Sequence, residues 1–204
     1  MQLEFNGKEI KFLPKDVAKT FPNLHSYQAS RNALKHVSKK YFAKLVELRW
    51  LFLCYNAIET IDNDAFKDLG KLSHLYLSSN KIKVVDPKWF QSLSELRYLK
   101  LQENEIENLD ENTFDNLIYL TSLDLESNKL TSIPAKLFNK NLELLHINLS
   151  SNQIIVINSD MFDHLLRLAV IWRILILRMQ HLPSYELKYL SQIRNAGSNF
   201  YMII

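Results

Sequence analysis

Few residues of this chain have the types and spacing that catalysis needs. Cys54 is the only cysteine, and no histidine lies between residues 37 and 73 to activate its thiol as a nucleophile. The sequence also lacks the G-x-x-x-x-G-K loop that holds phosphates, the H-E-x-x-H pair that binds zinc and the C-x-x-C pair. We therefore expect no catalytic residue, no cofactor and no metal site, and an enzyme is the least favoured function class.

A second group of residues has the chemistry of recognition. Large aromatic and cationic side chains gather in one part of the chain: Trp50, Phe52, His74, Tyr76 and Tyr98, with Arg49, Arg97 and Lys100. Tryptophan, tyrosine and arginine are the residues most enriched at protein-binding hot spots. These residues form one surface only if the fold brings distant segments of the chain side by side. Whether it does depends on the secondary-structure elements that carry them.

Two columns of residues repeat with a period of 24. The asparagine column is Asn32, Asn56, Asn80, Asn104, Asn128 and Asn152. The phenylalanine column is Phe42, Phe66, Phe90, Phe114, Phe138 and Phe162. Between the columns the pattern is L-x-x-L-x-L-x-x-N-x-I-x-x-I-x(4)-F-x-x-L. A fixed period of this length is typical of a solenoid built from stacked repeats.

Each part of the pattern has a physical role. Side chains alternate faces along a strand, so both leucines of L-x-L point into one core shared by neighbouring repeats. A buried asparagine satisfies the backbone groups of the turn after the strand, and the phenylalanines fill the core from the convex side. Asp86 before Pro87, and Asp110 before Glu111, predict short helical or irregular turns on that side.

This pattern resembles the leucine-rich repeat family in its typical 24-residue form, over about residues 3–168. The resemblance implies an α/β fold: a right-handed solenoid, or horseshoe, with a parallel sheet on its concave face and about seven repeats over residues 1–172. In this family the 24-residue form is commonest in secreted proteins and receptor ectodomains of animals. It therefore implies a non-enzymatic recognition module that is extracellular or at the cell surface. The alternative is a cytoplasmic scaffold or regulator that binds a partner protein through the same face.

The pattern weakens at both ends. Lys8 takes the asparagine position of the first repeat, and Arg173 falls where the last strand leucine should be. Residues 165–179 are apolar but contain three arginines and are too short for a membrane span, so we expect no transmembrane segment. We assign residues 173–204 to a C-terminal cap or irregular tail, with a helix near 184–194.

Strand alternation places the recognition residues on the concave face. The positions six before each asparagine are Ser26, Trp50, His74, Tyr98, Ser122 and His146, and those four before it are Gln28, Phe52, Tyr76, Lys100, Asp124 and Asn148. The aromatic residues should therefore meet, with Tyr55 at a strand end and an acidic region of Glu103, Asp124 and Glu126 beside them. The alternative is that the aromatic residues only cover the strand backbone or a terminal segment. His74 and His146 lie three strands apart, about 14 Å, which is too far to share a metal ion.

Composition limits the class of partner but does not decide the cellular compartment. The net charge of +3 comes from interspersed lysines and glutamates, without the basic stripe that nucleic-acid binding needs. We expect a protein partner, with a glycan or a lipid as alternatives, and the oligomeric state stays open. Cys54 cannot form an internal disulfide and the first residues lack a signal peptide, so the chain is either intracellular or a piece of a longer secreted protein. Asn148-Leu149-Ser150 is a candidate glycosylation site.

Overall fold

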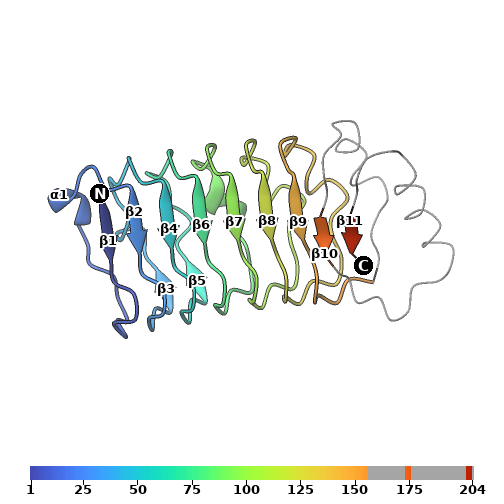
Figure 1. Ribbon diagram of the computed structural model, residues 1–204, viewed down its shortest axis with the longest axis horizontal. Coiled ribbons are helices and arrows are strands. Elements are labelled where there is room, and N and C mark those ends of the chain that lie inside the picture. The colour runs from blue at the N-terminus through green and yellow to red at the C-terminus, as the bar shows by residue number, and fades with distance from the viewer. Residues whose placement is uncertain (156–172, 176–200, 204) are drawn as a thin grey trace.

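The computed structural model describes residues 1–155, 173–175 and 201–203, and it shows a solenoid built around one parallel sheet (Figure 1). The sheet has seven strands in the order β1-β2-β4-β6-β7-β8-β9. Their bounds are Gln2–Glu4, Ser26–Gln28, Trp50–Phe52, His74–Tyr76, Tyr98–Lys100, Ser122–Asp124 and His146–Asn148. Each strand pairs in parallel with the next at an offset of 24 residues, as Leu51 does with Leu75. The predicted right-handed solenoid with about seven strands in one sheet is confirmed.

Short elements line the rest of each coil. A second parallel pair follows the asparagine column, formed by β3 (His36–Val37) and β5 (Thr60–Ile61). The bridge between Val84 and Asn108 continues it into the next two coils. The helix α1 (Val17–Thr20) lies in the first coil, and β10 (Arg173–Leu175) pairs in parallel with β11 (Tyr201–Ile203).

The two predicted capped turns have different outcomes. Asp86 caps the 3₁₀ helix η1 (Pro87–Phe90), and its Oδ1 accepts a hydrogen bond from the Lys88 N–H at 2.9 Å. Asp110 makes the same contact with the Asn112 N–H at 2.9 Å, but the residues after it form turns and no helix. The difference fits the proline at the first helical position, because Pro87 fixes its φ near the helical value and Glu111 does not.

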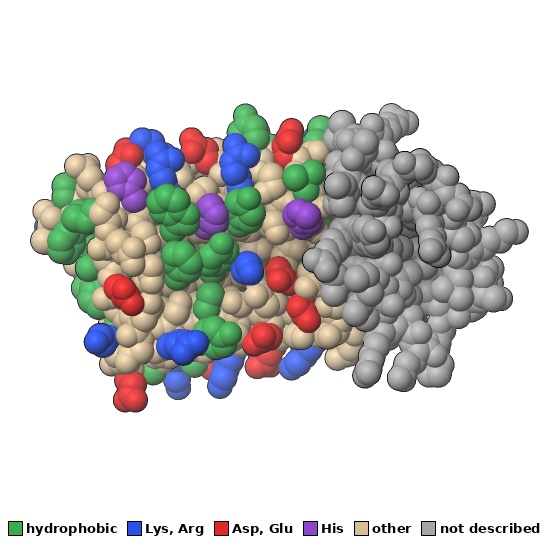
Figure 2. All heavy atoms as spheres, viewed as in Figure 1, with side chains coloured by type: hydrophobic (Ala, Val, Ile, Leu, Met, Phe, Trp, Pro, Cys, Tyr) green, Lys and Arg blue, Asp and Glu red, His purple; other side chains and the backbone are tan. Residues whose placement is uncertain are grey.

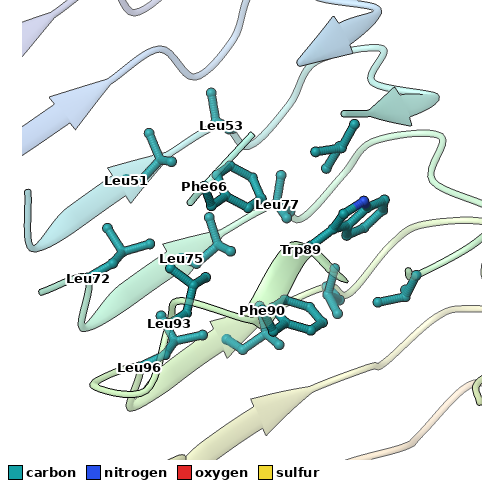
Figure 3. Packing of buried hydrophobic residues seen from close by; sticks show 14 of the residues in the cluster. Leu51, Leu53, Phe66, Leu72, Leu75, Leu77, Trp89, Phe90, Leu93 and Leu96 are labelled. Atoms are coloured by element: carbon teal, nitrogen blue, oxygen red, sulfur yellow. The ribbon is translucent and has the colours of Figure 1, made fainter. Parts of the chain in front are cut away.

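The core is a stack of leucines backed by the phenylalanine column. The strand leucines Leu51, Leu75 and Leu99 are fully buried, and Figure 3 shows Leu51 and Leu75 on the same side of the coil as Phe66 and Phe90. All the phenylalanines of the column from Phe42 to Phe138 are fully buried. Neighbouring rings of the column pack directly, as Phe42 does on Phe66 and Phe90 on Phe114, with ring-centroid distances of 6.1 Å and 5.9 Å. Phe162, the last of the column, lies outside the described residues.

The asparagine column forms the expected ladder of buried hydrogen bonds. The Nδ2 of Asn80 donates to the carbonyls of Leu53, Leu77 and Ser78, and its Oδ1 accepts from the Ile58 N–H at 3.0 Å. Leu53 and Ile58 belong to the preceding coil. Asn104 and Asn128 make the same set of contacts one coil further on. Each asparagine therefore closes its own turn and ties it to the coil before it.

A backbone feature of these turns was not predicted. The residue before each asparagine adopts a left-handed conformation with φ between 53° and 57°: Arg31, Tyr55, Ser79, Glu103, Ser127 and Ser151. Gly7 occupies the same position in the first coil, with φ 64°. A residue with a Cβ is rare in this region, and here the ladder bonds on either side hold it there.

The first coil keeps its place in the stack, although we expected regular stacking to weaken at Lys8. Strand β1 pairs with β2 in full register, and the Lys8 N–H donates to Asn32 Oδ1 at 3.0 Å. What changes is burial, because Leu3 and Phe5 are only half-buried. The expected helix at 184–194, the apolar run 165–179 and the boundary at 172 lie outside the described residues, apart from β10. Among the described residues, no helix is long and apolar enough to cross a membrane.

Candidate recognition surface

One face of the sheet carries the predicted recognition residues. Leu51, Leu75 and Leu99 point into the core and are fully buried, so the residues on either side of each point outward. We call Trp50, Phe52, His74, Tyr76 and Tyr98 the aromatic patch. Trp50 and Tyr98 are 36% and 40% exposed, so the patch reaches the solvent. Figure 2 shows hydrophobic side chains gathered on this part of the surface.

The side chains of the patch contact one another across three strands. His74 lies between Trp50 and Tyr98, with ring-centroid distances of 5.9 Å and 4.5 Å, and it stacks on Tyr98. Phe52 meets Tyr76 edge-on at 5.0 Å. The strand register brings these residues together as expected, and the mutual packing leaves Phe52, His74 and Tyr76 half-buried.

A hydrogen-bond chain reaches His74. The Ser73 hydroxyl lies 3.0 Å from the Arg49 carbonyl, to which it donates, and 2.8 Å from His74 Nδ1. Because a hydroxyl has a single proton, we expect Nδ1 to carry the ring proton and to donate to Ser73. In that tautomer the Nε2 of His74 is a hydrogen-bond acceptor in the aromatic patch.

We expect His74 to resist protonation. Burial lowers the pKa of His74 below its ordinary value of 6.5. A histidine whose pKa is lower when folded destabilises the fold as the pH falls through this range, because the unfolded chain then binds more protons. A ¹⁵N NMR titration should show a neutral ring protonated at Nδ1 at pH 7, titrating below the ordinary histidine value. Ser73→Ala removes the acceptor and should let the other tautomer appear, whereas an unchanged spectrum would contradict the hydrogen-bond chain.

Two of the three predicted cationic residues, Lys100 and Arg97, contact aromatic rings. The Lys100 Nζ lies 5.6 Å from the centroid of the Tyr76 ring, and the Arg97 guanidinium lies 5.7 Å from that of Tyr119. Arg49 is half-buried and precedes β4. Tyr55, at the end of the same strand, is exposed and holds the guanidinium of Arg31 at 5.4 Å. The contacts to Tyr119 and Arg31 were not predicted, because both residues lie in turns outside the strand columns.

The acidic region lies on the next strand of the same face. Asp124 is in β8, Glu126 follows it, and Glu103 follows β7. Burial, followed by the repulsion of Glu126 and Glu103, raises the pKa of Asp124, and a hydrogen bond from the Glu126 N–H and the charge of Lys100 oppose this rise. Ionisation of Asp124 in the acidic region therefore costs electrostatic free energy.

The remaining candidate residues are engaged in local contacts. Cys54 is half-exposed, as expected, and its Sγ accepts a hydrogen bond from the Ser78 hydroxyl at 3.1 Å. The Asn148 amide donates to Glu126 Oε2 at 3.0 Å, and its Oδ1 accepts from the Ser150 hydroxyl at 2.7 Å. A glycan on Asn148 would have to displace the Glu126 contact. In the part of the chain that the structure describes, no three His, Cys, Asp or Glu side chains are grouped to hold a metal ion.

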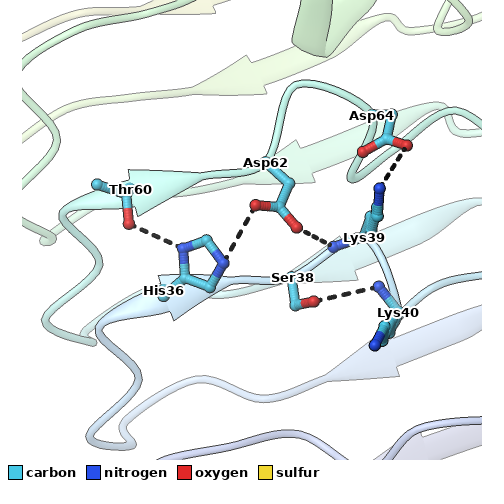
Figure 4. Close-up of polar contacts among 7 residues, drawn as sticks. All are labelled: His36, Ser38, Lys39, Lys40, Thr60, Asp62 and Asp64. Atoms are coloured by element: carbon cyan, nitrogen blue, oxygen red, sulfur yellow. Dashed lines mark hydrogen bonds and ion pairs between the residues drawn. The ribbon is translucent and has the colours of Figure 1, made fainter.

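A hydroxyl, an imidazole and a carboxylate also meet outside the sheet face (Figure 4). His36 Nδ1 lies 2.8 Å from the Thr60 hydroxyl, and its Nε2 lies 3.3 Å from Asp62 Oδ1. Side chains of these types activate nucleophiles in hydrolases. Here Asp62 Oδ2 also accepts from the Lys39 N–H at 2.9 Å, so the carboxylate ties one coil to the coil before it. We interpret the cluster as a structural link between β3 and β5.

Beside the aromatic patch the sheet face is hollowed. A groove of about 570 Å³ is lined by Met1, Gln2, His25, Ser26, Gln28, Trp50 and Phe52. Trp50 and Phe52 therefore present their rings to an open groove on one side and to the rest of the patch on the other. A partner that contacts the patch can extend into this groove.

The fold defines a class of protein: a repeat solenoid of the kind used in recognition modules. The family model described as BspA type leucine rich repeat region (6 copies) matches residues 59–172, and the model described as leucine rich repeat matches residues 22–82. The chain belongs to the leucine-rich repeat family.

A solved structure supports the same fold. The chain superposes on the crystal structure of a TLR13–ssRNA13 complex with a TM-score of 0.78 and 21% sequence identity, over 87% of this chain and 26% of that one. The chain thus spans about a quarter of the length of that TLR13 chain. No curated protein matches it by sequence.

Proposed function

We propose that the chain is a non-enzymatic recognition module that binds a partner protein through the aromatic patch. The flanking residues Arg49, Arg97 and Lys100 form the border of the contact. The observation that carries the proposal is the contiguous set of aromatic rings on the sheet face of β4, β6 and β7. In the repeats on either side of these strands the same columns hold smaller or more polar residues, which meet water at lower cost: Ser26, Gln28, Ser122, Asp124, His146 and Asn148.

The chemistry of the surface favours a protein over a nucleic acid. Asp124 and Glu126 lie beside the patch and would repel a phosphate backbone, which proteins bind through lysine and arginine. Aromatic side chains next to arginines instead form the well-packed anchors of protein interfaces. The single-stranded RNA of the TLR13 complex is a property of that receptor and is not carried over to this chain.

A double substitution tests the proposal against a purely structural role. Phe52→Ser with Tyr76→Ser introduces a residue type already present in the sheet columns and removes no side chain from the core. The fold should remain nearly as stable in urea unfolding, while the affinity of the partner should fall by about 2 kcal/mol or more, roughly thirtyfold. Partner affinity is measured by titration calorimetry on the full chain.

Two controls separate the outcomes. Phe12→Ser with Val84→Ser changes two exposed apolar residues away from the patch and should affect neither stability nor affinity. Leu75→Ala removes a fully buried side chain and should cost about 2–5 kcal/mol of stability. If the serine double variant loses as much stability as Leu75→Ala, the aromatic residues are structural and the proposal fails.

We propose an extracellular or cell-surface setting on the family resemblance of the 24-residue repeat. The second candidate is an intracellular scaffold or regulator, which the free, half-exposed thiol of Cys54 favours because such thiols persist in reducing compartments. Genomic sequence upstream of Met1 separates the two settings. An in-frame signal peptide with paired cysteines supports secretion, and a confirmed start at Met1 without them supports the cytoplasm.

A further inference from the structure

The sheet face has a second half whose chemistry complements the aromatic patch. The patch occupies β4, β6 and β7, and the acidic region begins on β8. Figure 2 shows acidic side chains next to the hydrophobic ones on this face. Lys100 separates the halves, and its ammonium lies over the Tyr76 ring. Among the described residues, it forms no ion pair with Asp124 or Glu126.

The carboxylates of the acidic region have free acceptor atoms. Asp124 accepts from the Glu126 N–H through Oδ1, and Glu126 accepts from Asn148 through Oε2. Glu103 accepts from the Ser79 hydroxyl through Oε2. The second oxygen of each carboxylate has no hydrogen-bond partner in the described part of the chain. The Oε1 of Gln102, in the turn between Lys100 and Glu103, is buried and also lacks a partner.

A cation would relieve the repulsion at this place. The charges of Glu126 and Glu103 repel that of Asp124, and the ammonium of Lys100 lies over the Tyr76 ring on the aromatic side. A guanidinium offers five N–H donors in a planar fork, enough for the free oxygens of Asp124 and Glu126. An ammonium would supply the charge with fewer and less directed bonds.

We infer that the occupant of this face is a protein segment that carries a large apolar side chain and an arginine or lysine about 12 Å apart. The apolar side chain covers Phe52 and Tyr76, and the cation binds between Asp124 and Glu126. The distance follows from the two strand spacings between β6 and β8 and the three between β4 and β8, each about 4.8 Å. An extended segment rises about 3.3 Å per residue, so the two side chains are about four residues apart. This inference rests on the proposed function of the aromatic patch.

The test uses peptides selected on the full chain from a random dodecapeptide display library. We expect the enriched sequences to pair an aromatic or large aliphatic residue with an arginine or lysine about four positions away. The selected peptides are then synthesised, and their affinities are measured against the wild type and against Asp124→Asn with Glu126→Gln. The double variant should bind at least about tenfold more weakly, and its affinity should depend less on salt.

A charge-matched control isolates the place of the effect. Glu107→Gln with Glu111→Gln removes the same charge from exposed residues outside the acidic region and should leave the affinity unchanged. Replacing the peptide's cation with glutamine should weaken binding to the wild type. It should cause no further loss of affinity in the Asp124/Glu126 variant, because both changes remove the same contact.

The outcomes separate this inference from the function on which it rests. If Phe52→Ser with Tyr76→Ser abolishes peptide binding and Asp124→Asn with Glu126→Gln does not, the aromatic patch binds its partner and the inference is wrong. If neither double variant matters, or no peptide is enriched, both are wrong. Enrichment of acidic or uncharged peptides also overturns the inference. If Ca²⁺ alone competes with the peptides at the same carboxylates, the region is a cation site and not a contact for a partner's side chain.

Discussion

Replacing Asn80 with alanine should lower the free energy of unfolding by about 3–5 kcal/mol. The change leaves the buried N–H of Ile58 without its acceptor and removes three bonds to backbone carbonyls. Asn104 still donates to the Leu77 carbonyl, so this carbonyl keeps a hydrogen-bond partner. The loss of stability should therefore be smaller than the summed contributions of the four hydrogen bonds. Urea unfolding, monitored by circular dichroism, measures the difference in unfolding free energy between the variant and the wild type. The dependence of that free energy on urea concentration should be the same for both.

Two further variants test the cause of that loss. Asn80→Asp keeps the volume but puts a carboxylate oxygen against the carbonyls of Leu53 and Leu77, so it should lose at least as much stability as alanine. Asn32→Ala changes the same column where it is only half-buried, and water can replace its bonds. A loss at Asn32 as large as at Asn80 would mean that burial does not set the strength of the ladder.

Phe114→Ala should destabilise the chain by a similar amount, about 3–5 kcal/mol, for a different reason. The Phe114 ring is fully buried between Phe90 and Phe138, with centroid distances of 5.9 Å and 6.3 Å. Truncation leaves a cavity between three coils, and neighbours fixed by the ladder cannot collapse into it. Thermal and urea unfolding should both register the loss.

Conservative and surface substitutions serve as controls for the phenylalanine column. Phe114→Leu refills most of the volume and should cost clearly less than alanine. Phe12→Ala changes a phenylalanine that is 76% exposed, and its effect should stay within about 0.5 kcal/mol. A strongly destabilising Phe12→Ala would show that the first coil depends on packing that its exposure does not indicate.

The repeat made most of the fold predictable from the sequence. The period of 24 determines which strands are neighbours, and strand alternation determines which side chains point outward, so Trp50 was expected beside His74 and His74 beside Tyr98. The buried roles of Asn80 and Phe90 followed from the need to satisfy a turn and to fill a core. All of these are properties that depend only on position within the repeat.

What could not be predicted depends on contacts within single turns. The left-handed conformation of Tyr55 and Ser79 has no signal in residue types that seldom adopt it. The hydrogen bond between Ser73 and the Arg49 carbonyl, from which we expect the tautomer of His74, depends on a hydroxyl orientation that no pattern encodes. The half-burial of Phe52 and Tyr76 likewise results from how the two rings meet, since alternation indicates only that they leave the core.

The ladder points in one direction along the chain. Asn56, Asn80, Asn104, Asn128 and Asn152 each donate to a carbonyl 27 residues earlier and accept from an N–H 22 residues earlier. Each of these asparagines therefore closes on backbone groups that are synthesised before it, and none of these bonds needs sequence still to be made. We expect the ladder to let each coil form on the coil before it during translation.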